Sequence, residues 1–242
     1  MELVLDTHTH TISSGHAYST ITENAKEAYK KGLQLICMTD HGPKMPGGAH
    51  LYHFGNLKVI PDKIEGVEIL KGVEANIMDV DGTLDIPESI LKKLDIVIAS
   101  LHDACFEPSD DIERNTKAII NALRNPYVDI IGHPGNPIYP INIEKVVNAA
   151  KEYGKFIEIN NSSFITSRVG SEDNCSLIAR KAKEIGAKIS VGSDAHISFD
   201  VGNFDEAIRI IKEANIEEDM ILNTDVKKIK EYIINKKRNF NI

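Results

Sequence analysis

The stretch LVLDTHTHT, residues 3–11, joins a short apolar run to two histidines, His8 and His10. The apolar run has the length and composition of a buried parallel strand. Because side chains alternate along an extended chain, His8 and His10 lie on the same side of it. Two unrelated imidazoles on one strand edge and two ligands of one metal ion both fit this stretch. The other segments of the chain have to decide between these two interpretations.

Six more segments resemble this strand and alternate with longer amphipathic segments, which indicates repeated strand–helix units. In order, the seven predicted strands are LVLDT, LQLICMT, EILKGVEA, LDIVIASL, YVDIIGH, KFIEIN and AKISVGS. Predicted helices include TENAKEAYKKG, in which Thr20 and Glu23 have capping-box spacing and Gly32 suits the helix end. Others are DIERNTKAIINALRN, NIEKVVNAAKEYG, SEDNCSLIARKAKEIG and NFDEAIRIIKEAN.

The chain of 242 residues has room for one large α/β barrel or two small domains, and we expect one domain over residues 1–242. The barrel should occupy about residues 3–215, followed by a C-terminal helix and tail over about 216–242. The terminal sequence DVKKIKEYIINKKRNFNI is basic and amphipathic. We interpret its charges as the solvated face of a docked helix, in preference to a membrane or RNA contact.

Composition narrows the function further. Hydrophobic residues at 42% and charged residues at 26% are ordinary for a globular protein, and the net charge of −8 disfavours stable nucleic-acid binding. Three well-separated cysteines argue against a disulfide scaffold or a zinc ribbon. Since no leader pattern or long apolar run is visible, we expect a cytoplasmic protein without a membrane partner. The sequence leaves homo-oligomer formation open.

Metal-ligand residue types follow six of the seven predicted strands, and only KFIEIN ends differently, in Asn160 and Asn161. In a barrel of parallel strands these ends meet at one face, where barrel enzymes place their active sites. With His16 from the first loop, the candidate metal ligands are His8, His10, His16, His41, Glu74, His102, His133, Asp194 and His196.

Imidazole and carboxylate ligands without thiolates suit zinc, iron or manganese in a catalytic site. Nine ligands are too many for one four-coordinate ion, so two or three ions are needed, and Glu74 could bridge two of them. A multinuclear site favours attack by a metal-activated hydroxide, with other metal charge stabilising the leaving oxygen. Hydrolysis of a phosphate ester is the expected reaction.

These residues, in this order, resemble the PHP family, named for polymerase and histidinol phosphatase. Its pattern corresponds here to HTH at 8–10, DH at 40–41, Glu74 in GVEAN, His102 in SLHD, His133 in GHPGNP and DAH at 194–196. The resemblance runs from residue 3 to at least residue 204. Further segments are similar to the YcdX-type phosphatase subgroup: THTISSGHAYST, MTDHGP, GVEANI, DVDG, IGHPGNP, EINNSSF, SRVGSEDNC and GSDAH.

The resemblance implies a distorted TIM-like barrel, (β/α)7, of seven parallel strands with the active site at its C-terminal face. It implies three divalent ions, with zinc expected and manganese or iron as alternatives. Their ligand sets would be His8, His10, Glu74 and Asp194; then Glu74, His102 and His133; then His16, His41 and His196. A hydroxide bridging the ions would attack the phosphate monoester of a small substrate.

Three residues outside the ligand sets are candidate catalytic groups. Asp40, like Asp6, could orient a ligand histidine or form a turn. His53, in the Gly/Pro-rich loop HGPKMPGGAHLYHFGN, could contact substrate or donate a proton, with a surface histidine as the alternative. Arg168 could bind a substrate phosphate or pair with Glu172 or Asp173. The roles of His50, Asn160 and Asn161 stay open.

Rival functions come from the same family and from other classes. Histidinol-phosphate phosphatase and nucleotide or nucleic-acid phosphodiesterase activities are the alternatives within the family. Amidohydrolases share the first-strand H-x-H but use a bridging lysine at a strand end where this chain has Glu74 and His102. A non-catalytic metal-binding module is disfavoured by the complete ligand set.

Overall fold

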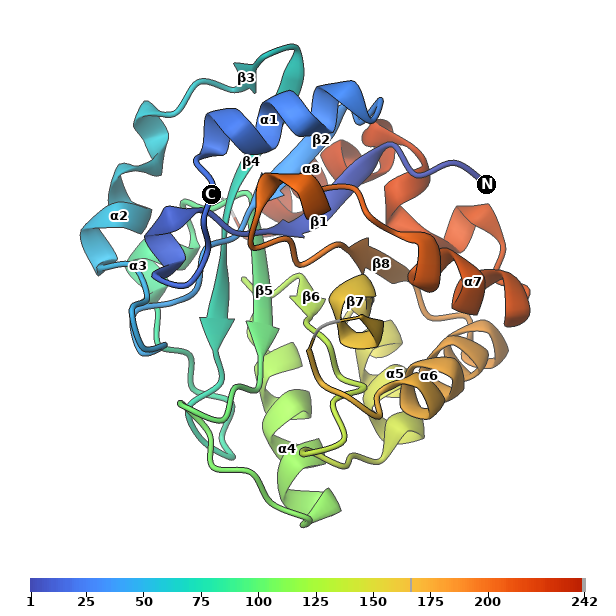
Figure 1. Ribbon diagram of the computed structural model, residues 1–242. Coiled ribbons are helices and arrows are strands. Elements are labelled where there is room, and N and C mark those ends of the chain that lie inside the picture. Colours follow the sequence, from blue (N-terminus) through green and yellow to red (C-terminus); the bar gives the residue numbers. More distant parts are fainter. Residues whose placement is uncertain (166, 241–242) are drawn as a thin grey trace.

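Seven parallel strands form a nearly closed barrel in the computed structural model, which describes residues 1–165 and 167–240 (Figure 1). This confirms the predicted α/β, TIM-like fold. The neighbouring strands are, in order, β1 (Leu5–Thr9), β2 (Leu35–Met38), β4 (Val67–Asn76), β5 (Ile96–Ser100), β6 (Ile130–Ile131), β7 (Phe156–Asn160) and β8 (Ile189–Gly192).

Helices follow most strands and lie outside the sheet, as Figure 1 shows for α4 to α7. The predicted capping box of the first helix is present, because Thr20 and Glu23 exchange side-chain and backbone hydrogen bonds. The helices are α1 (Ile21–Lys30), α2 (Leu51–Asn56), α3 (Glu88–Leu91), α4 (Ile112–Leu123), α5 (Ile143–Glu152), α6 (Glu172–Ile185), α7 (Asp205–Glu213) and α8 (Val226–Phe240). Short 3₁₀ turns include η1 (Ile12–Ser14), η3 (Asn161–Phe164), η4 (Ser198–Asp200) and η6 (Leu222–Thr224).

Two local elements differ from the prediction. A short strand, β3 (Lys63–Ile64), pairs antiparallel with the start of β4. The last 6 residues of the segment predicted as a Gly/Pro-rich loop are helical, since they form α2 (Leu51–Asn56). His50 caps this helix, and its Nδ1 accepts the Tyr52 N–H at 3.2 Å. His50 is therefore the N-cap residue at which the loop ends and α2 begins.

The seam between the first and last strands is closed by a side chain from beyond the barrel. Asn223 is fully buried; its Nδ2 donates to the carbonyls of Leu5 and Val191, at 2.9 and 2.7 Å, and its Oδ1 accepts the Val191 N–H at 2.8 Å. Towards the C-terminal end, His8 and Ala195 carbonyls accept backbone N–H groups across the same seam, each at 2.9 Å. The Asn223 side chain thus bridges β1 and β8 by hydrogen bonds to the backbone of both strands.

Apolar side chains form two cores, one between the helices and the sheet and one inside the barrel. The inner core contains Leu5, Ile98 and Ile130 from the strands together with Ile229 and Ile233 from α8. Helix α8 therefore packs against the inner core, as expected for a docked final helix. Residues 241–242 of the predicted tail lie outside the described residues.

The end of the barrel next to α8 also holds a buried ion pair. Lys236 Nζ lies 2.7 Å from Asp129 Oδ2, and both side chains are less than 5% exposed. Tyr232 donates its hydroxyl to Asp129 Oδ1 at 2.9 Å, and the Val97 N–H donates to Oδ2 at 2.8 Å.

Within the described part of the chain, none of the helices has the length and apolar character needed to span a membrane.

Candidate metal centre

An irregularity in β1 places the two opening histidines at the mouth of the barrel. The pairing with β2 shifts register between Asp6 and Thr9, so that Leu5 joins the inner core while His8 and His10 reach the strand ends. The Asp6 carboxylate accepts the backbone N–H groups of His8, Ser193 and Gly202 at 2.9 to 3.2 Å. Asp6 therefore holds the bulged backbone and not a histidine ring.

Glu74, at the C-terminal end of β4, lies at the centre of a ring of imidazoles. Its side chain is 1% exposed, and its two oxygens approach nitrogen atoms that come from four other strand ends. Oε2 lies 2.8 Å from His41 Nδ1, 3.3 Å from His8 Nε2 and 3.5 Å from His10 Nε2, and Oε1 lies 2.8 Å from His133 Nε2 and 3.2 Å from His102 Nε2.

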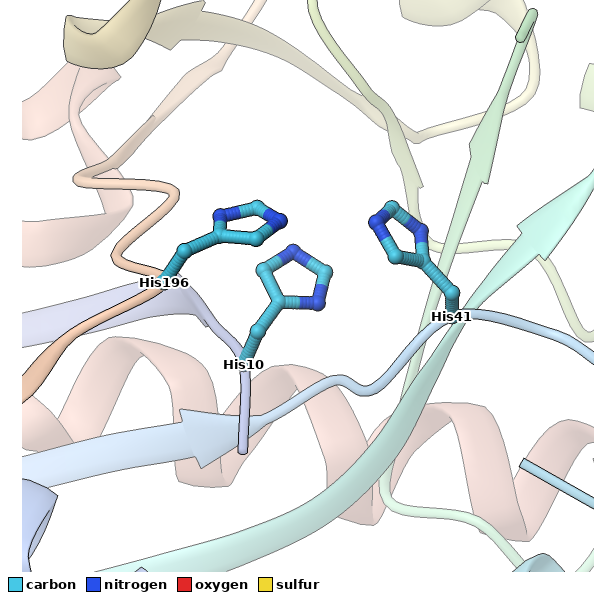
Figure 2. Close-up of side chains that lie close together, drawn as sticks. All are labelled: His10, His41 and His196. Atoms are coloured by element: carbon cyan, nitrogen blue, oxygen red, sulfur yellow. The ribbon is translucent and has the colours of Figure 1, made fainter. Parts of the chain in front are cut away.

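The remaining candidate ligands complete the same cluster. Asp194 Oδ1 lies 3.1 Å from His10 Nε2 and 3.6 Å from His8 Nε2. His16 and His196 meet with their Nε2 atoms 3.1 Å apart. Figure 2 shows the rings of His10, His41 and His196 converging from separate segments. The structure therefore brings all nine predicted ligands together.

Three groups have nitrogen or oxygen atoms within 4.8 Å of one another: His8 with His10 and Asp194; His10 with His41 and His196; and His41 with Glu74 and His102. The first matches the predicted ligand set for one ion, with Glu74 beside it. His133, which was predicted to share the second ion with Glu74 and His102, lies 2.8 Å from the other oxygen of Glu74 but is not a member of the third group. His41 lies between the second and third predicted sets.

The donor atoms fit metal ions better than they fit one another. Among the described residues, the buried atoms without a hydrogen-bond partner include His8 Nε2, His41 Nδ1 and Glu74 Oε2. They lie close together, yet their geometry is not that of a hydrogen bond. Since unpaired buried polar atoms are costly, the cluster has the properties of a preformed site for divalent ions.

The charges of the cluster also favour cations. Burial opposes ionisation of Glu74, but the neighbouring His8, His102 and His41 hold its pKa well below the usual value. Burial likewise opposes a charged His8, but the carboxylates of Glu158, Glu74 and Asp194 raise the pKa of His8 well above normal. Burial and Arg168 lower the pKa of His133 to about 4. The cluster thus combines anionic carboxylates with a neutral His133 and with a His8 ring whose positive charge those carboxylates favour, a charge that a bound metal ion would replace.

Backbone strain is concentrated at this site. Three non-glycine residues here have positive φ: His133 at 31°, Arg168 at 52° and Asp194 at 56°. Such conformations are uncommon and persist where surrounding contacts enforce them. The Asp194 N–H donates to the His8 carbonyl at 2.9 Å, and the His133 N–H donates to Glu158 Oε2 at 2.7 Å. These hydrogen bonds therefore stabilise unfavourable backbone conformations that position the side chains of the metal centre.

Three buried polar side chains hold the ligand rings from behind. Glu158 Oε1 lies 2.7 Å from His8 Nδ1, Asn76 Oδ1 lies 2.7 Å from His102 Nδ1, and Ser14 Oγ lies 3.2 Å from His10 Nδ1. Glu158, Asn76 and Ser14 were not among the site residues predicted from the sequence. Glu158 had one available signal, because it is a charged residue between two isoleucines in the buried strand FIEIN.

Asp40 acts on His10 through Ser14 and does not touch the ring. It accepts hydrogen bonds from the Ser14 hydroxyl at 2.7 Å and from the Thr11 N–H and hydroxyl at 2.7 and 2.8 Å. Burial opposes its ionisation, but His53, His10 and these donors lower the pKa of Asp40 to about 2. His53 Nε2 lies 3.4 Å from Asp40 Oδ2.

A cavity of about 370 Å³ opens onto the cluster. Its lining includes Glu74, Arg168 and Asp194, together with Met45 from the Gly/Pro-rich segment HGPKMPGGAHLYHFGN. Neither Asp40 nor His53 is among the described residues that line it, so both lie behind the ligand shell.

Arg168 lies at the cavity wall and pairs with a predicted metal ligand. Its Nη2 is ion-paired with Asp194 and donates to Asn160 Oδ1 at 3.1 Å, and its Nε donates to Ser163 Oγ at 2.9 Å. The alternative partner Glu172 is ion-paired with Arg209 instead.

The two asparagines that end β7 have different positions. Asn160 links Arg168 to Glu158 and Asp194. Asn161 lines the cavity, and its Oδ1 accepts backbone N–H groups at the start of α7.

Comparison with known proteins adds three findings. Residues 6–164 match the model of the PHP domain family. A protein of Thermoanaerobacter sp. (strain X514) named "probable phosphatase" is 82% identical over 238 residues, covering 98% of this chain and 97% of that protein. A "probable phosphatase" of Acetivibrio thermocellus is 57% identical and covers 98% of both chains.

Among solved structures, the histidinol phosphate phosphatase of Lactococcus lactis, complexed with zinc, L-histidinol and phosphate, has a similar fold. The TM-score is 0.59 at 19% sequence identity, and the match covers 88% of this chain and 94% of that one.

Proposed function

The chain belongs to the PHP family and is a phosphatase, and on that premise we propose that it hydrolyses a phosphate monoester at a cluster of three divalent metal ions. Zinc is the metal we expect, with manganese or iron as alternatives. The proposed substrate is a small phosphorylated molecule, and the proposed location is the cytoplasm. Placement in the YcdX-type subgroup stays a prediction.

The observation that supports this proposal most strongly is the placement of Glu74. Each of its carboxylate oxygens faces a different group of imidazoles, which suits a ligand that bridges two ions. His8, His10 and Asp194 would complete one site beside it, and His102 and His133 the next. His16, His41 and His196 would hold the third ion. When bound, the ions would supply an activated water at neutral pH and neutralise charge on the phosphoryl oxygens.

The protein's own groups would orient the substrate. We assign Arg168 the role of binding a phosphoryl oxygen, because its guanidinium lies at the cavity wall and is held by Asp194, Asn160 and Ser163. A guanidinium fixed in this way binds phosphate with little loss of side-chain entropy. Asp40 would keep His10 oriented through Ser14. His53, which lies behind Asp40, would support that arrangement.

A metal-reconstitution experiment tests the proposal. Purified protein would be stripped with a chelator, reloaded with zinc, manganese or iron, and analysed for bound metal. Each form would then be assayed on an aryl phosphate, histidinol phosphate, nucleoside monophosphates and a phosphodiester. We expect about three bound ions per chain and hydrolysis of monoesters only in the reloaded forms. Failure of every reloaded form to release phosphate would refute the proposal, and preference for the phosphodiester would favour the nuclease alternative.

A further inference from the structure

Glu158, the middle residue of β7, contacts two segments that carry predicted metal ligands. Its side chain is fully buried, and its Oε1 lies 2.7 Å from the Nδ1 atom of His8. Its Oε2 accepts the His133 backbone N–H at 2.7 Å and the Asn160 side-chain amide at 3.1 Å. His8 and His133 belong to different proposed ion sites, on opposite oxygens of Glu74.

We infer that Glu158 is a positioning residue for two of the three ion sites. By accepting a hydrogen bond from His8 Nδ1, it keeps the ring proton on that nitrogen and leaves Nε2 available as a metal ligand. By accepting the His133 N–H, it stabilises the positive φ of 31° that directs His133 Nε2 to Glu74. This inference rests on the proposed metal centre.

The hydrogen-bond inventory supports a carboxylate at this position. Three donors converge on Glu158, from His8, His133 and Asn160, and a carboxylate offers only acceptors. A glutamine would turn its amide NH₂ towards one of those donors. It could avoid that conflict only if His8 moved its proton to Nε2, the atom that must bind the metal.

A glycine opposite Glu158 is an independent sign that the contact is close. A Cβ atom added to Gly192 would clash with Glu158 Oε1 and with His8 Cβ. The φ angle of Gly192 is not in the left-handed region, so backbone conformation alone does not require glycine there. The space is needed because Glu158 and His8 meet beside β8.

The test compares Glu158→Gln with a matched variant at the other end of the barrel, Asp129→Asn. Both changes neutralise a buried carboxylate with three hydrogen-bond donors, but Asp129 contacts no candidate ligand. Zinc affinity would be measured by competition with a chromophoric chelator, and zinc content by elemental analysis. We expect Glu158→Gln to bind zinc about 10 to 100-fold more weakly than wild type and Asp129→Asn to bind it normally once folded. Gly192→Ala should weaken zinc binding in the same direction.

A measurement on the unmodified protein keeps the test independent of whether the variants fold. In zinc-loaded protein labelled with ¹⁵N-histidine, two-bond ¹H–¹⁵N correlations should show His8 protonated on Nδ1. Protonation on Nε2, unchanged zinc affinity in Glu158→Gln, or an equal loss in Asp129→Asn would overturn the inference. Wild-type protein that binds none of zinc, manganese and iron would instead overturn the proposed metal centre, and this inference with it.

Discussion

Both ends of the barrel bury a carboxylate, but they neutralise it differently. Near α8, Asp129 has the Lys236 ammonium group at 2.7 Å and two further donors, from Tyr232 and Val97. At the mouth, Glu74 is equally buried and is surrounded by five imidazole nitrogens within 3.5 Å. One of its oxygens has no hydrogen-bond partner among the described residues.

The difference separates a structural end from a reactive end. A lysine supplies a permanent positive charge that folds with the chain, so the Asp129 cluster is complete in the protein alone. Imidazoles are neutral ligands as readily as cations, so the Glu74 cluster can take its positive charge from solution. Substitutions at the two ends should therefore have opposite consequences for activity and stability.

The largest effect is expected for Glu74→Gln. Removing the charge from the central carboxylate should lower zinc affinity and phosphatase turnover more than about 100-fold, beyond the loss typical for a residue behind the ligands. Zinc content by elemental analysis and turnover of an aryl phosphate would measure the change. Wild-type turnover in this variant would contradict the proposed bridging role.

Lys236→Met should act at the other end, on folding. It leaves the Asp129 carboxylate buried without its counter-charge, which costs roughly 3–5 kcal/mol of unfolding free energy. For a chain of this size the melting temperature should fall by about 6–20 °C. Calorimetry of the zinc-loaded variant would measure the fall, while turnover per folded molecule at 25 °C should match wild type. A large loss of zinc from the folded variant would show that the two ends are coupled.

Arg168→Met should reduce catalysis while retaining most of the metal. Losing hydrogen bonds from a charged group costs about 1.5–3 kcal/mol, or roughly 10 to 150-fold in kcat/KM. The variant also frees Asp194 from its ion pair, so zinc content must be checked alongside the kinetics. Arg168→Lys keeps the charge but not the planar fork, and it should recover only part of the loss. Unchanged kcat/KM in Arg168→Met would exclude a phosphate contact.

The smallest effect is expected for Tyr232→Phe. Asp129 would lose one of three donors but keep Lys236 and Val97, so the unfolding free energy should fall by about 1 kcal/mol. The melting temperature should drop by about 2–4 °C with no change in turnover. A fall as large as that of Lys236→Met would mean that the hydroxyl and the ammonium group act as one unit, which a double-mutant cycle would reveal.

The ends of the strands could be predicted from the sequence because histidines and carboxylates follow directly after the apolar runs. His8, Glu74 and Asp194 could each be placed on one face once the strands were recognised, since all parallel strands end on the same side. The alternation of apolar and amphipathic segments predicted seven strands in repeated strand–helix units, and the resemblance to the PHP family implied that these strands form a barrel.

What the sequence did not reveal depends on contacts between distant segments. Glu158 lies within a strand and not at its end, and its importance comes from His8, 150 residues away. The bulge in β1 likewise follows from pairing with β2 and β8. The distinction between Arg168 bound to Asp194 and Arg168 bound to Glu172 required the backbone conformation of the loop, which local composition does not fix.

Asn223 has a consequence for the order in which the molecule is made. The amide that joins β1 to β8 lies in η6, after every strand of the barrel. During synthesis, β1 must remain without this partner until residue 223 has been made. Until then, β1 and β8 can be joined only by direct backbone hydrogen bonds at the mouth of the barrel, such as that from the Asp194 N–H to the His8 carbonyl. Because the proposed ion site combines His8, after the start of β1, with Asp194, after β8, its ligand set is complete only once the last strand of the barrel has been made.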